Sequence, residues 1–526
     1  MNDNEVKRGT ISLHGAQRIA DVPRRIFGSF IEHLGRSVYG GIYEPEHETA
    51  DEHGFRGDVL DLVKELGVTC VRYPGGNFVS NYRWQDGVGP KSQRPVRRDL
   101  AWHTTEPNQV GLDDFYHWSK AAGTEIMMAV NMGTQGLQSA LDEIEYANGA
   151  PGTALADWRV ANGIREPMDI RMWCIGNEMD GPWQVGHMSA EEYAVAVERT
   201  AHAMKLAEPG LELVACGSSS ASMPTFGTWE RTVLTRAYDY LDFVSCHAYY
   251  FERGAKSPQD FLASGENMKH FIATVAAQAD DAKAAHQGDH DIALSFDEWG
   301  VWYQDDWNRQ EAEWKAQNRV LHNEPWPTAP HLLEDTYTVR DAVVEGALMI
   351  ELLAHCDRVR SASRAQLVNV IAPIMTQNGG PAWKQTVFYP FAFAAHHAVG
   401  DAFAPTIHSS QVHTESYGDV DAVRAVVTFD QQTHSGCVLM VNRDMQQATE
   451  LHLDLQDLLS NTQFTEIIAD EQVLLHDDDP YATNTIEHPD RVKLRTLDIT
   501  ASAEHPAQFT VTLPEESWAG FAFHLV

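Results

Sequence analysis

Two glutamates occupy positions from which a pair of carboxylates can do chemistry. Glu178 follows an apolar run in the stretch WCIGNEMD, and Glu298 ends a second apolar run in IALSFDEW. Two carboxyl groups on either side of a small space are what the hydrolysis of a glycosidic bond requires. One gives a proton to the leaving oxygen, and the other, ionised, attacks the anomeric carbon. We therefore predict that Glu298 is the nucleophile and Glu178 the general acid and base.

Further polar side chains follow other apolar runs in the same way. They are Glu32 in IFGSFIEH, Arg72 and Asn77 in VTCVRYPGGN, Asn177 beside Glu178, His247 and Tyr249 in DFVSCHAYY, and Gln366 in AQLVNVIAP. Arg72 also has a structural interpretation, in which it pairs with a carboxylate inside the fold. His247 is either a buried structural histidine or a residue that orients Glu298 or contacts sugar. Asn177 offers an amide that can bind a sugar hydroxyl next to the reacting carbon.

The apolar runs themselves indicate how these side chains are brought together. Between residues 26 and 373 there are eight such runs, the last at 365–373, and segments with helical spacing of apolar residues separate them. The runs are apolar on both faces, as parallel strands covered by helices must be. This alternation predicts a (β/α)8 barrel, in which functional groups gather at the C-terminal ends of the strands. An open doubly wound sheet is the competing architecture, but no glycine-rich phosphate loop follows the first run.

In such a barrel the two glutamates belong to the fourth and seventh strands. Side chains reaching inward from there can approach to about 5 Å, which is the separation in retaining glycosidases, whereas inverting enzymes need a wider gap. Each carboxylate disfavours ionisation of the other, so one keeps its proton near neutral pH. When Glu298 becomes an ester its charge vanishes, and the pKa of Glu178 should fall so that it can act as a base.

The chain changes character after about residue 385. Short alternating runs such as DAVRAVVTFD, GCVLMVNR and QFTVTLP predict an antiparallel β-sandwich, of jelly-roll type, with no strong helix between its strands. The N-terminal TISLHGAQRIA also alternates and is expected to add a strand to this domain. We predict three regions: an N-terminal strand segment at 1–22, the catalytic barrel at 23–384 and the β-sandwich at 385–526.

Composition limits the partners of the protein. The formal net charge of the chain is −36, which disfavours nucleic acid and anionic membranes. The first residues, MNDNEVKRGT, lack the apolar stretch of a secretory signal, so we expect a cytoplasmic protein. The most apolar long segment, DAVVEGALMIELLAHC, contains two glutamates and is interpreted as a buried helix rather than a membrane span. The six cysteines form no CxxC pair and are expected to be reduced core residues.

The sequence contains two pairs of residues that could be interpreted as metal ligands. The pairs Glu32-His33 and His286…His290 resemble metal ligands, but no HExxH sequence is present and the second pair lies in a charged loop. The chain shows no nucleotide-binding fingerprint and no GxSxG nucleophile elbow. We therefore expect neither a catalytic metal nor a cofactor.

Taken as a set and in order, six stretches resemble glycoside hydrolase family 51. They are FIEHLGRSVYGGIY, VRYPGGNFVSNYRWQDGVGP, WCIGNEMDGPWQVGH, SCHAYY, FDEWGVWY and QLVNVIAPI. The resemblance covers nearly the whole chain. Typical members are retaining α-L-arabinofuranosidases with a (β/α)8 barrel followed by a β-sandwich. Many bacterial members are hexamers, so the resemblance implies a homo-oligomer.

The resemblance also implies roles for individual residues. Glu178 matches the acid and base of the family, and Glu298 matches its nucleophile. The positions that match its furanose-binding residues are Glu32, Arg72, Asn77, Asn177, Tyr249 and Gln366, and the tryptophans near the leaving group look like Trp102 and Trp302. The stretch 303–335 looks like an insertion whose role family similarity does not define.

The leading functional hypothesis is the exo-hydrolysis of terminal, non-reducing α-L-arabinofuranosyl units. The absence of a signal favours imported arabino-oligosaccharides and arabinoxylo-oligosaccharides as substrates. An alternative keeps the barrel but changes the substrate, giving an endo-glucanase or a xylosidase. A third hypothesis, a non-catalytic sugar-binding protein, predicts the loss of one of the two carboxylates, and both are present.

Overall fold

The computed structural model describes residues 6–13, 17–318, 325–460 and 462–526. Within these residues, eight strands form a closed barrel, and every neighbouring pair in it is parallel. In chain order the strands are β3 (Gly28–Phe30), β4 (Cys70–Tyr73), β7 (Glu125–Val130), β8 (Met172–Ile175), β9 (Glu212–Ala215), β10 (Phe243–Tyr250), β11 (Ala293–Val301) and β12 (Val359–Arg364). The predicted (β/α)8 barrel is confirmed, and β8 and β11 are its fourth and seventh strands.

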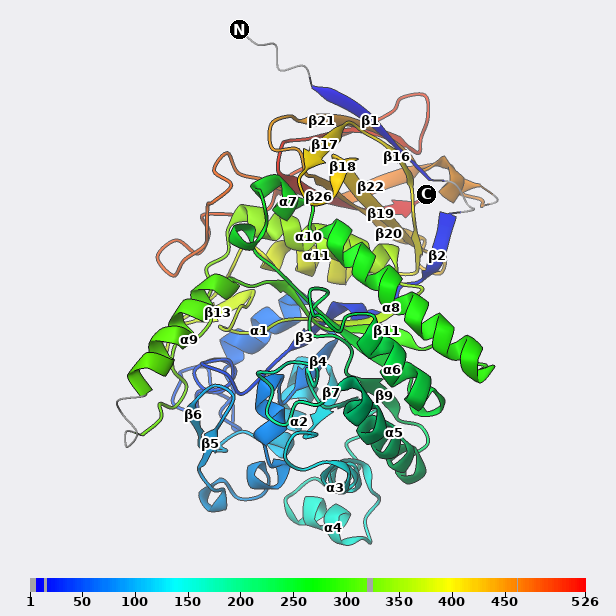
Figure 1. Ribbon diagram of the computed structural model, residues 1–526. Coiled ribbons are helices and arrows are strands. Elements are labelled where there is room, and N and C mark those ends of the chain that lie inside the picture. The colour runs from blue at the N-terminus through cyan, green and yellow to red at the C-terminus, as the bar shows by residue number, and fades with distance from the viewer. Residues whose placement is uncertain (1–5, 14–16, 319–324, 461) are drawn as a thin grey trace.

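Helices separate the strands and cover the outside of the barrel (Figure 1). They are α1 (Gly57–Leu66), α2 (Leu112–Ala122), α3 (Leu137–Asn148), α4 (Ala154–Ala161), α5 (Ala190–Ala207), α6 (Thr228–Ala237), α7 (Pro258–Leu262), α8 (Gly265–His286), α9 (Gln304–Asn318), α10 (Val339–Ala354) and α11 (Phe388–His397). Local signals set their ends. The Ser189 hydroxyl caps α5 by accepting from the amide of Glu192, and Gly67 ends α1 in the left-handed conformation.

The eighth strand lies earlier in the chain than the sequence pattern predicted. The run at 365–373 follows β12 as a loop, although Leu367, Val368 and Val370 are fully buried in it. Strand β12 instead has the mixed sequence VRSASR, whose Ser361, Ser363 and Arg364 are buried. An apolar run signals burial, and here a buried loop gave the same signal as a buried strand.

The C-terminal region forms two sheets made mostly of antiparallel strands, as expected for a β-sandwich. The five-stranded sheet has the order β16 (Thr406–His408), β1 (Lys7–Ser12), β21 (Thr449–Asp454), β25 (Gln508–Leu513) and β24 (Ile499–Ala501). The seven-stranded sheet has the order β2 (Arg18–Asp21), β15 (Asp401–Phe403), β19 (Val423–Asp430), β20 (Ser435–Asn442), β26 (Ser517–Leu525), β22 (Ile467–Leu475) and β23 (Arg495–Thr496).

Three two-stranded ribbons complete the structure. They are β5 (Arg97–Asp99) with β6 (Thr104–Glu106), β13 (Ile374–Thr376) with β14 (Ala382–Lys384), and β17 (Gln411–Thr414) with β18 (Gly418–Asp421). The first ribbon lies in the connection between β4 and α2, on the side of the barrel where the strands end. The turn between its two strands carries Trp102, whose indole donates a hydrogen bond to Glu32.

The N-terminal strands pair with the C-terminal sheets. Strand β1 pairs with β16 and, in parallel, with β21, while β2 pairs with β15. The expectation of no strong helix after residue 385 is wrong, because α11 follows and packs between the barrel helices α1 and α10 and the strands β20 and β26. Its sequence, FYPFAFAAHH, is rich in aromatic residues and contains a proline, both of which weaken the helical signal. The predicted domain bounds of 1–22, 23–384 and 385–526 stay predictions.

Figure 1 shows the sandwich resting on the barrel, with α10 and α11 between them and with strand β1 and the C-terminus on the sandwich side. Helix α10 is buried along nearly its whole length, which explains its apolar sequence. None of the helices in the described ranges is long and apolar enough to cross a membrane. All six cysteines are buried and free.

Candidate active site

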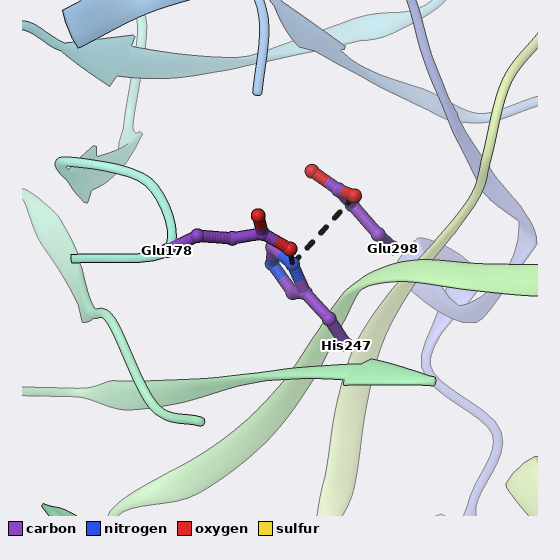
Figure 2. Close-up of side chains that lie close together, drawn as sticks. All are labelled: Glu178, His247 and Glu298. Carbon is purple, nitrogen blue, oxygen red and sulfur yellow. Dashed lines mark hydrogen bonds and ion pairs between the residues drawn. The ribbon is translucent and has the colours of Figure 1, made fainter. Parts of the chain in front are cut away.

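Glu178 and Glu298 point toward each other from opposite parts of the barrel (Figure 2). Glu178 follows the end of β8, and Glu298 lies within β11 near its C-terminal end. One carboxylate oxygen of each glutamate and one ring nitrogen of His247 lie within 4.8 Å of one another. The structure therefore brings the two predicted carboxylates together across a space the size of a few atoms.

The backbone after β8 turns sharply in order to aim Glu178 inward. Gly176 has φ of 97° and Glu178 itself has φ of 42°, both in the left-handed region. A non-glycine residue rarely adopts this conformation, and such strain is found mainly where the surrounding structure holds a functional group in place. The Glu178 carbonyl accepts a hydrogen bond from the amide of Gly181 at 2.8 Å, which closes the turn.

Glu298 is buried among groups that favour its charged form. Arg72 donates from Nη1 to its Oε1 at 2.8 Å, and the Tyr249 hydroxyl donates to its Oε2 at 2.6 Å. Burial would raise the pKa of Glu298, but the charges of His247 and Arg72 and the hydrogen bond from Tyr249 outweigh it and leave the pKa below its ordinary value. An ionised carboxylate is the form that a nucleophile needs.

Glu178 has a different set of neighbours. His247 Nδ1 lies 2.9 Å from Glu178 Oε1, and the indole of Trp183 donates to Glu178 Oε2 at 2.6 Å. The same His247 nitrogen is 3.6 Å from Glu298 Oε2, so this ring stands between the two acids. Burial would lower the pKa of His247, but the two carboxylates outweigh it and raise that pKa. A protonated His247 can therefore donate to Glu178 and balance part of the charge.

Glu32 forms a second acidic position on the same side of the barrel. Its Oε1 accepts hydrogen bonds from the amide of Phe78 at 2.9 Å and from the indole of Trp102 at 2.8 Å. Gln366 donates from Nε2 to Glu32 Oε2 at 3.2 Å. Burial and the nearby charge of Glu298 raise the pKa of Glu32 to about 8, although the bonds from Phe78 and Trp102 lower it. Glu32 is thus held rigidly while its Oε2 keeps capacity for a further donor.

Gly76 shows that Glu32 and Glu298 border one space. A Cβ atom built on Gly76 would lie 3.0 Å from Glu298 Oε1 and 3.2 Å from Glu32 Oε2. A Cβ on Gly75 would lie 2.8 Å from the Cγ of Glu32. Any larger residue at either position would push on the acidic groups, which explains the glycine pair in RYPGGN.

Two asparagines, Asn177 and Asn77, extend the hydrogen-bonded group around Glu298. Arg72 donates from Nη2 to Asn177 Oδ1 at 2.7 Å, and Asn177 Nδ2 donates to Asn77 Oδ1 at 3.2 Å. Arg72 is fully buried and pairs with Glu298, as its structural interpretation expects, while its contact with sugar stays a prediction. Trp302 packs edge-on against Tyr249 with ring centroids 5.0 Å apart. The structure thus places the eleven residues that the sequence singled out in two groups, eight around Glu298 and three around Glu32, which border one space at Gly76.

Sequence reasoning missed two residues of this set. Trp183 touches Glu178 directly and is 52% exposed, so its ring lies at the mouth of the site. Asp297 lies beneath Glu298, where its Oδ2 is 3.9 Å from Arg72 Nε, and burial raises its pKa. The signal for Trp183 was its place five residues after Glu178 in the same motif. Asp297 gave no signal of its own, because it adjoins the more conspicuous Glu298.

Glu178, His247 and Glu298 are also the group among the described residues whose atoms could surround a metal ion. Their surroundings do not suit a cation. The Arg72 guanidinium already contacts Glu298 Oε1, and Tyr249 donates to Glu298 Oε2, so both oxygens are engaged. A carboxylate pair bridged by a histidine fits proton transfer better than ligation.

A closed parallel barrel with two facing glutamates at the ends of its fourth and seventh strands defines a glycoside hydrolase site. Two family models match the chain: "Alpha-L-arabinofuranosidase 1 domain" over residues 62–267 and "Alpha-L-arabinofuranosidase C-terminal domain" over residues 297–517. The chain belongs to the family 51 α-L-arabinofuranosidases and is a glycoside hydrolase.

Individual relatives support this assignment. An intracellular exo-α-(1→5)-L-arabinofuranosidase of Bifidobacterium longum is 67% identical over 97% of this chain and 91% of its own length. An exo-α-(1→6)-L-arabinofuranosidase of the same species is 49% identical over 98% of this chain and 97% of its own. The solved structure of AbfB, a family 51 α-L-arabinofuranosidase of B. longum, has a TM-score of 0.93 and 65% identity, covering 98% of this chain and all of that one.

A more distant structure agrees. An α-L-arabinofuranosidase of Thermotoga maritima, solved as an arabinose complex, has a TM-score of 0.84 and 30% identity over 98% of this chain and 100% of that one. At that identity the barrel and the sandwich are both retained.

Proposed function

We propose that this protein releases terminal, non-reducing α-L-arabinofuranosyl units from arabino- and arabinoxylo-oligosaccharides by double displacement with retention of configuration. The observation that carries the proposal is the approach of Glu178 and Glu298, whose nearest oxygens lie within 4.8 Å. That separation is close to the one typical of retaining enzymes and leaves no room for an attacking water between the two acids.

In the first step, Glu298 attacks the anomeric carbon and Glu178 protonates the glycosidic oxygen. The bond from the anomeric carbon to the leaving oxygen breaks as the bond to a Glu298 oxygen forms. Arg72 and Tyr249 keep Glu298 ionised before the attack. His247 can hold Glu178 in its inward orientation from Nδ1.

In the second step, Glu178 takes a proton from a water that attacks the same carbon from the side the leaving group has vacated. Esterified Glu298 no longer carries a charge, so Glu178 can ionise and act as the base. The ester bond breaks, Glu298 regains its carboxylate and the sugar leaves with its original anomeric configuration.

Recognition of the furanose ring is assigned to the polar groups around this pair. Glu32 and Gln366 would bind hydroxyl groups away from the reacting carbon, while Asn77 and Asn177 would bind those near it. Glu32, Gln366 and Asn177 are buried and Asn77 is partly buried, and hydrogen bonds join the four in two pairs, so their positions are fixed before the sugar arrives. Trp183 and Trp302 would contact the leaving group at the mouth, where the Trp183 ring is exposed.

The names of the relatives support the exo mode but leave the linkage open. The relative at 67% identity is named for α-(1→5) linkages and the one at 49% for α-(1→6) linkages. Several relatives are named intracellular, which supports the expected cytoplasmic location. Endo-glucanase or xylosidase activity is not favoured by these comparisons. A homo-oligomer stays a prediction.

The test follows the stereochemistry of the product by proton NMR during hydrolysis of p-nitrophenyl α-L-arabinofuranoside. We expect the α-anomer of arabinose to form first and then to equilibrate. A β-anomer as the first product would refute the double displacement. Parallel assays on the xyloside, on linear arabino-oligosaccharides and on arabinoxylo-oligosaccharides define the glycone and the linkage.

A further inference from the structure

We propose that Asp99 is a positioning residue of the furanose pocket, which acts by holding Trp102 where its indole reaches Glu32. Asp99 ends strand β5, and the turn formed by residues 100–103 leads into β6. The inference rests on the function proposed above, because it concerns the binding of the same sugar. It adds a residue outside the set that the motifs identified.

The carboxylate of Asp99 organises the whole turn. Its Oδ1 accepts from the amide of Ala101 at 2.9 Å, and its Oδ2 accepts from the amide of Trp102 at 3.1 Å and from the Thr104 hydroxyl at 3.2 Å. Asp99 is only 2% exposed. A buried carboxylate that accepts three hydrogen bonds fixes the backbone around it tightly.

The side chains of the turn point in two directions, toward solvent and toward the site. Leu100 at its tip is 46% exposed, whereas Trp102 turns inward and donates from its indole to Glu32 Oε1 at 2.8 Å. Trp102 and Glu32 are 70 positions apart in the chain, so the turn has to carry the indole to this acid, and the ring also packs edge-on against Trp307 with centroids 5.4 Å apart. His103, the next residue, has φ of 55°, which lets the chain reverse into β6 directly after the tryptophan.

A surface turn does not require a buried acid. Solvent or a serine could satisfy the same amides at an exposed tip, and burial of a carboxylate disfavours its charged form. Burial raises the pKa of Asp99 to about 7, while the bonds from Ala101, Trp102 and Thr104 lower it. The unfavourable burial is explained if the exact position of Trp102 matters for the binding of substrate.

The expected effect falls on binding rather than on turnover. Glu32 lies away from the reacting carbon in the proposed complex, so its contact with the sugar is similar in the ground state and the transition state. Loss of such a contact raises KM and leaves kcat nearly unchanged. For Asp99→Ala we expect KM to rise by up to about 10-fold, the range for the loss of one hydrogen bond.

The experiment is a double-mutant cycle with p-nitrophenyl α-L-arabinofuranoside as substrate. It compares the wild type with Asp99→Ala, Trp102→Phe and the double variant, and it measures KM, kcat and the inhibition constant of L-arabinose. If Asp99 acts through Trp102, the double variant should resemble Trp102→Phe alone, because the two effects are not independent. Additive effects on KM would overturn the inference.

A matched control separates positioning from stability. Asp113 is also buried and accepts from the Tyr146 hydroxyl at 2.8 and 2.9 Å, but neither residue contacts the site. Asp113→Ala should lower the melting temperature and leave KM unchanged. If Asp99→Ala does not fold, Thr104→Val removes one of the three bonds and should raise KM about 2- to 5-fold.

The outcomes distinguish the two proposals. An active wild type whose KM is insensitive to Asp99→Ala or Thr104→Val defeats the role of Asp99 alone. A wild type that does not cleave the arabinofuranoside defeats the proposed function. An equal rise in KM for Asp113→Ala would show a general loss of structure and would also overturn the role of Asp99.

Discussion

The rim of the barrel and the core of the β-sandwich bury very different residues. In the sandwich, the core is apolar throughout and includes Leu453, Phe509 and Phe521, each at most 2% exposed. At the rim, Arg72 is fully buried and Glu298 is only 7% exposed. Burial of charge is unfavourable unless partners compensate it.

The difference indicates that burial in the sandwich serves stability, whereas burial at the rim serves catalysis. In the sandwich, alternation along β21 or β25 is sufficient to predict which side chains are inside. At the rim, Arg72 and Glu298 are partners of each other, and the charge of Arg72 helps to lower the pKa of Glu298. Substitutions should therefore affect the two regions in different ways, with loss of activity at the rim and loss of stability in the sandwich.

The strongest separation is expected from Glu298→Ala. It removes the nucleophile, and we expect kcat to fall by roughly 10⁴-fold or more. Because the variant leaves the buried Arg72 without its closest carboxylate partner, the melting temperature should fall as well, but the protein that stays folded should still lack turnover. Activity assays and thermal unfolding on the same preparation test both statements. Substantial residual turnover in a homogeneous preparation would contradict the role of Glu298.

A smaller and substrate-dependent loss is expected from Glu178→Ala. Without the acid, hydrolysis of natural linkages should slow by about 10²- to 10⁴-fold, whereas substrates with good leaving groups need no proton and should lose much less. Added azide should replace the attacking water and give an arabinosyl azide of retained configuration. Equal losses on both kinds of substrate would exclude Glu178 as the acid.

The matching experiment in the sandwich is Phe521→Ala. Phe521 is fully buried and lies 5.7 Å from Phe509 and 6.0 Å from Phe523, measured between ring centroids. We expect the free energy of unfolding to fall by about 3–5 kcal/mol, with kcat per folded molecule unchanged. A large change in kcat at a temperature where the variant is folded would show that the two regions are coupled.

The mildest effect is expected from Tyr249→Phe on the pH profile. Glu298 has a lowered pKa, so the ionised nucleophile is present at neutral pH and is lost only as the pH falls through that low value. Removal of the Tyr249 hydroxyl removes one cause of the lowering. The acidic limb of kcat/KM should therefore move to higher pH, by roughly one unit. A shift to lower pH would contradict this account of Glu298.

Much of this architecture could be predicted from the sequence, for identifiable reasons. The barrel followed from apolar runs that end in polar residues, and Glu178 and Glu298 followed from their places at the ends of two runs. The eighth strand was missed because its sequence VRSASR, with Ser361, Ser363 and Arg364 buried, looks like a surface segment. Helix α11 was missed because its aromatic residues serve an interface between domains.

Contacts made by turns were the least predictable part of the site. The bond from Trp183 to Glu178 depends on the path of a loop, and the role proposed for Asp99 depends on two donors from a four-residue turn and one from the strand that follows it. Neither has a periodic signature, because loops follow no repeating spacing. Such contacts are visible only when atoms are placed in three dimensions.

The pairing of β1 and β2 with late strands also has a consequence for biosynthesis. Arg18 of β2 forms an ion pair with Asp401, 383 positions further along the chain. At about 5–20 residues per second, a nascent chain waits roughly 20–80 seconds before that partner emerges from the ribosome. During that interval β1 and β2 lack the strands with which they pair in the folded protein. They can join their sheets only after β15, β16 and β21 have been translated.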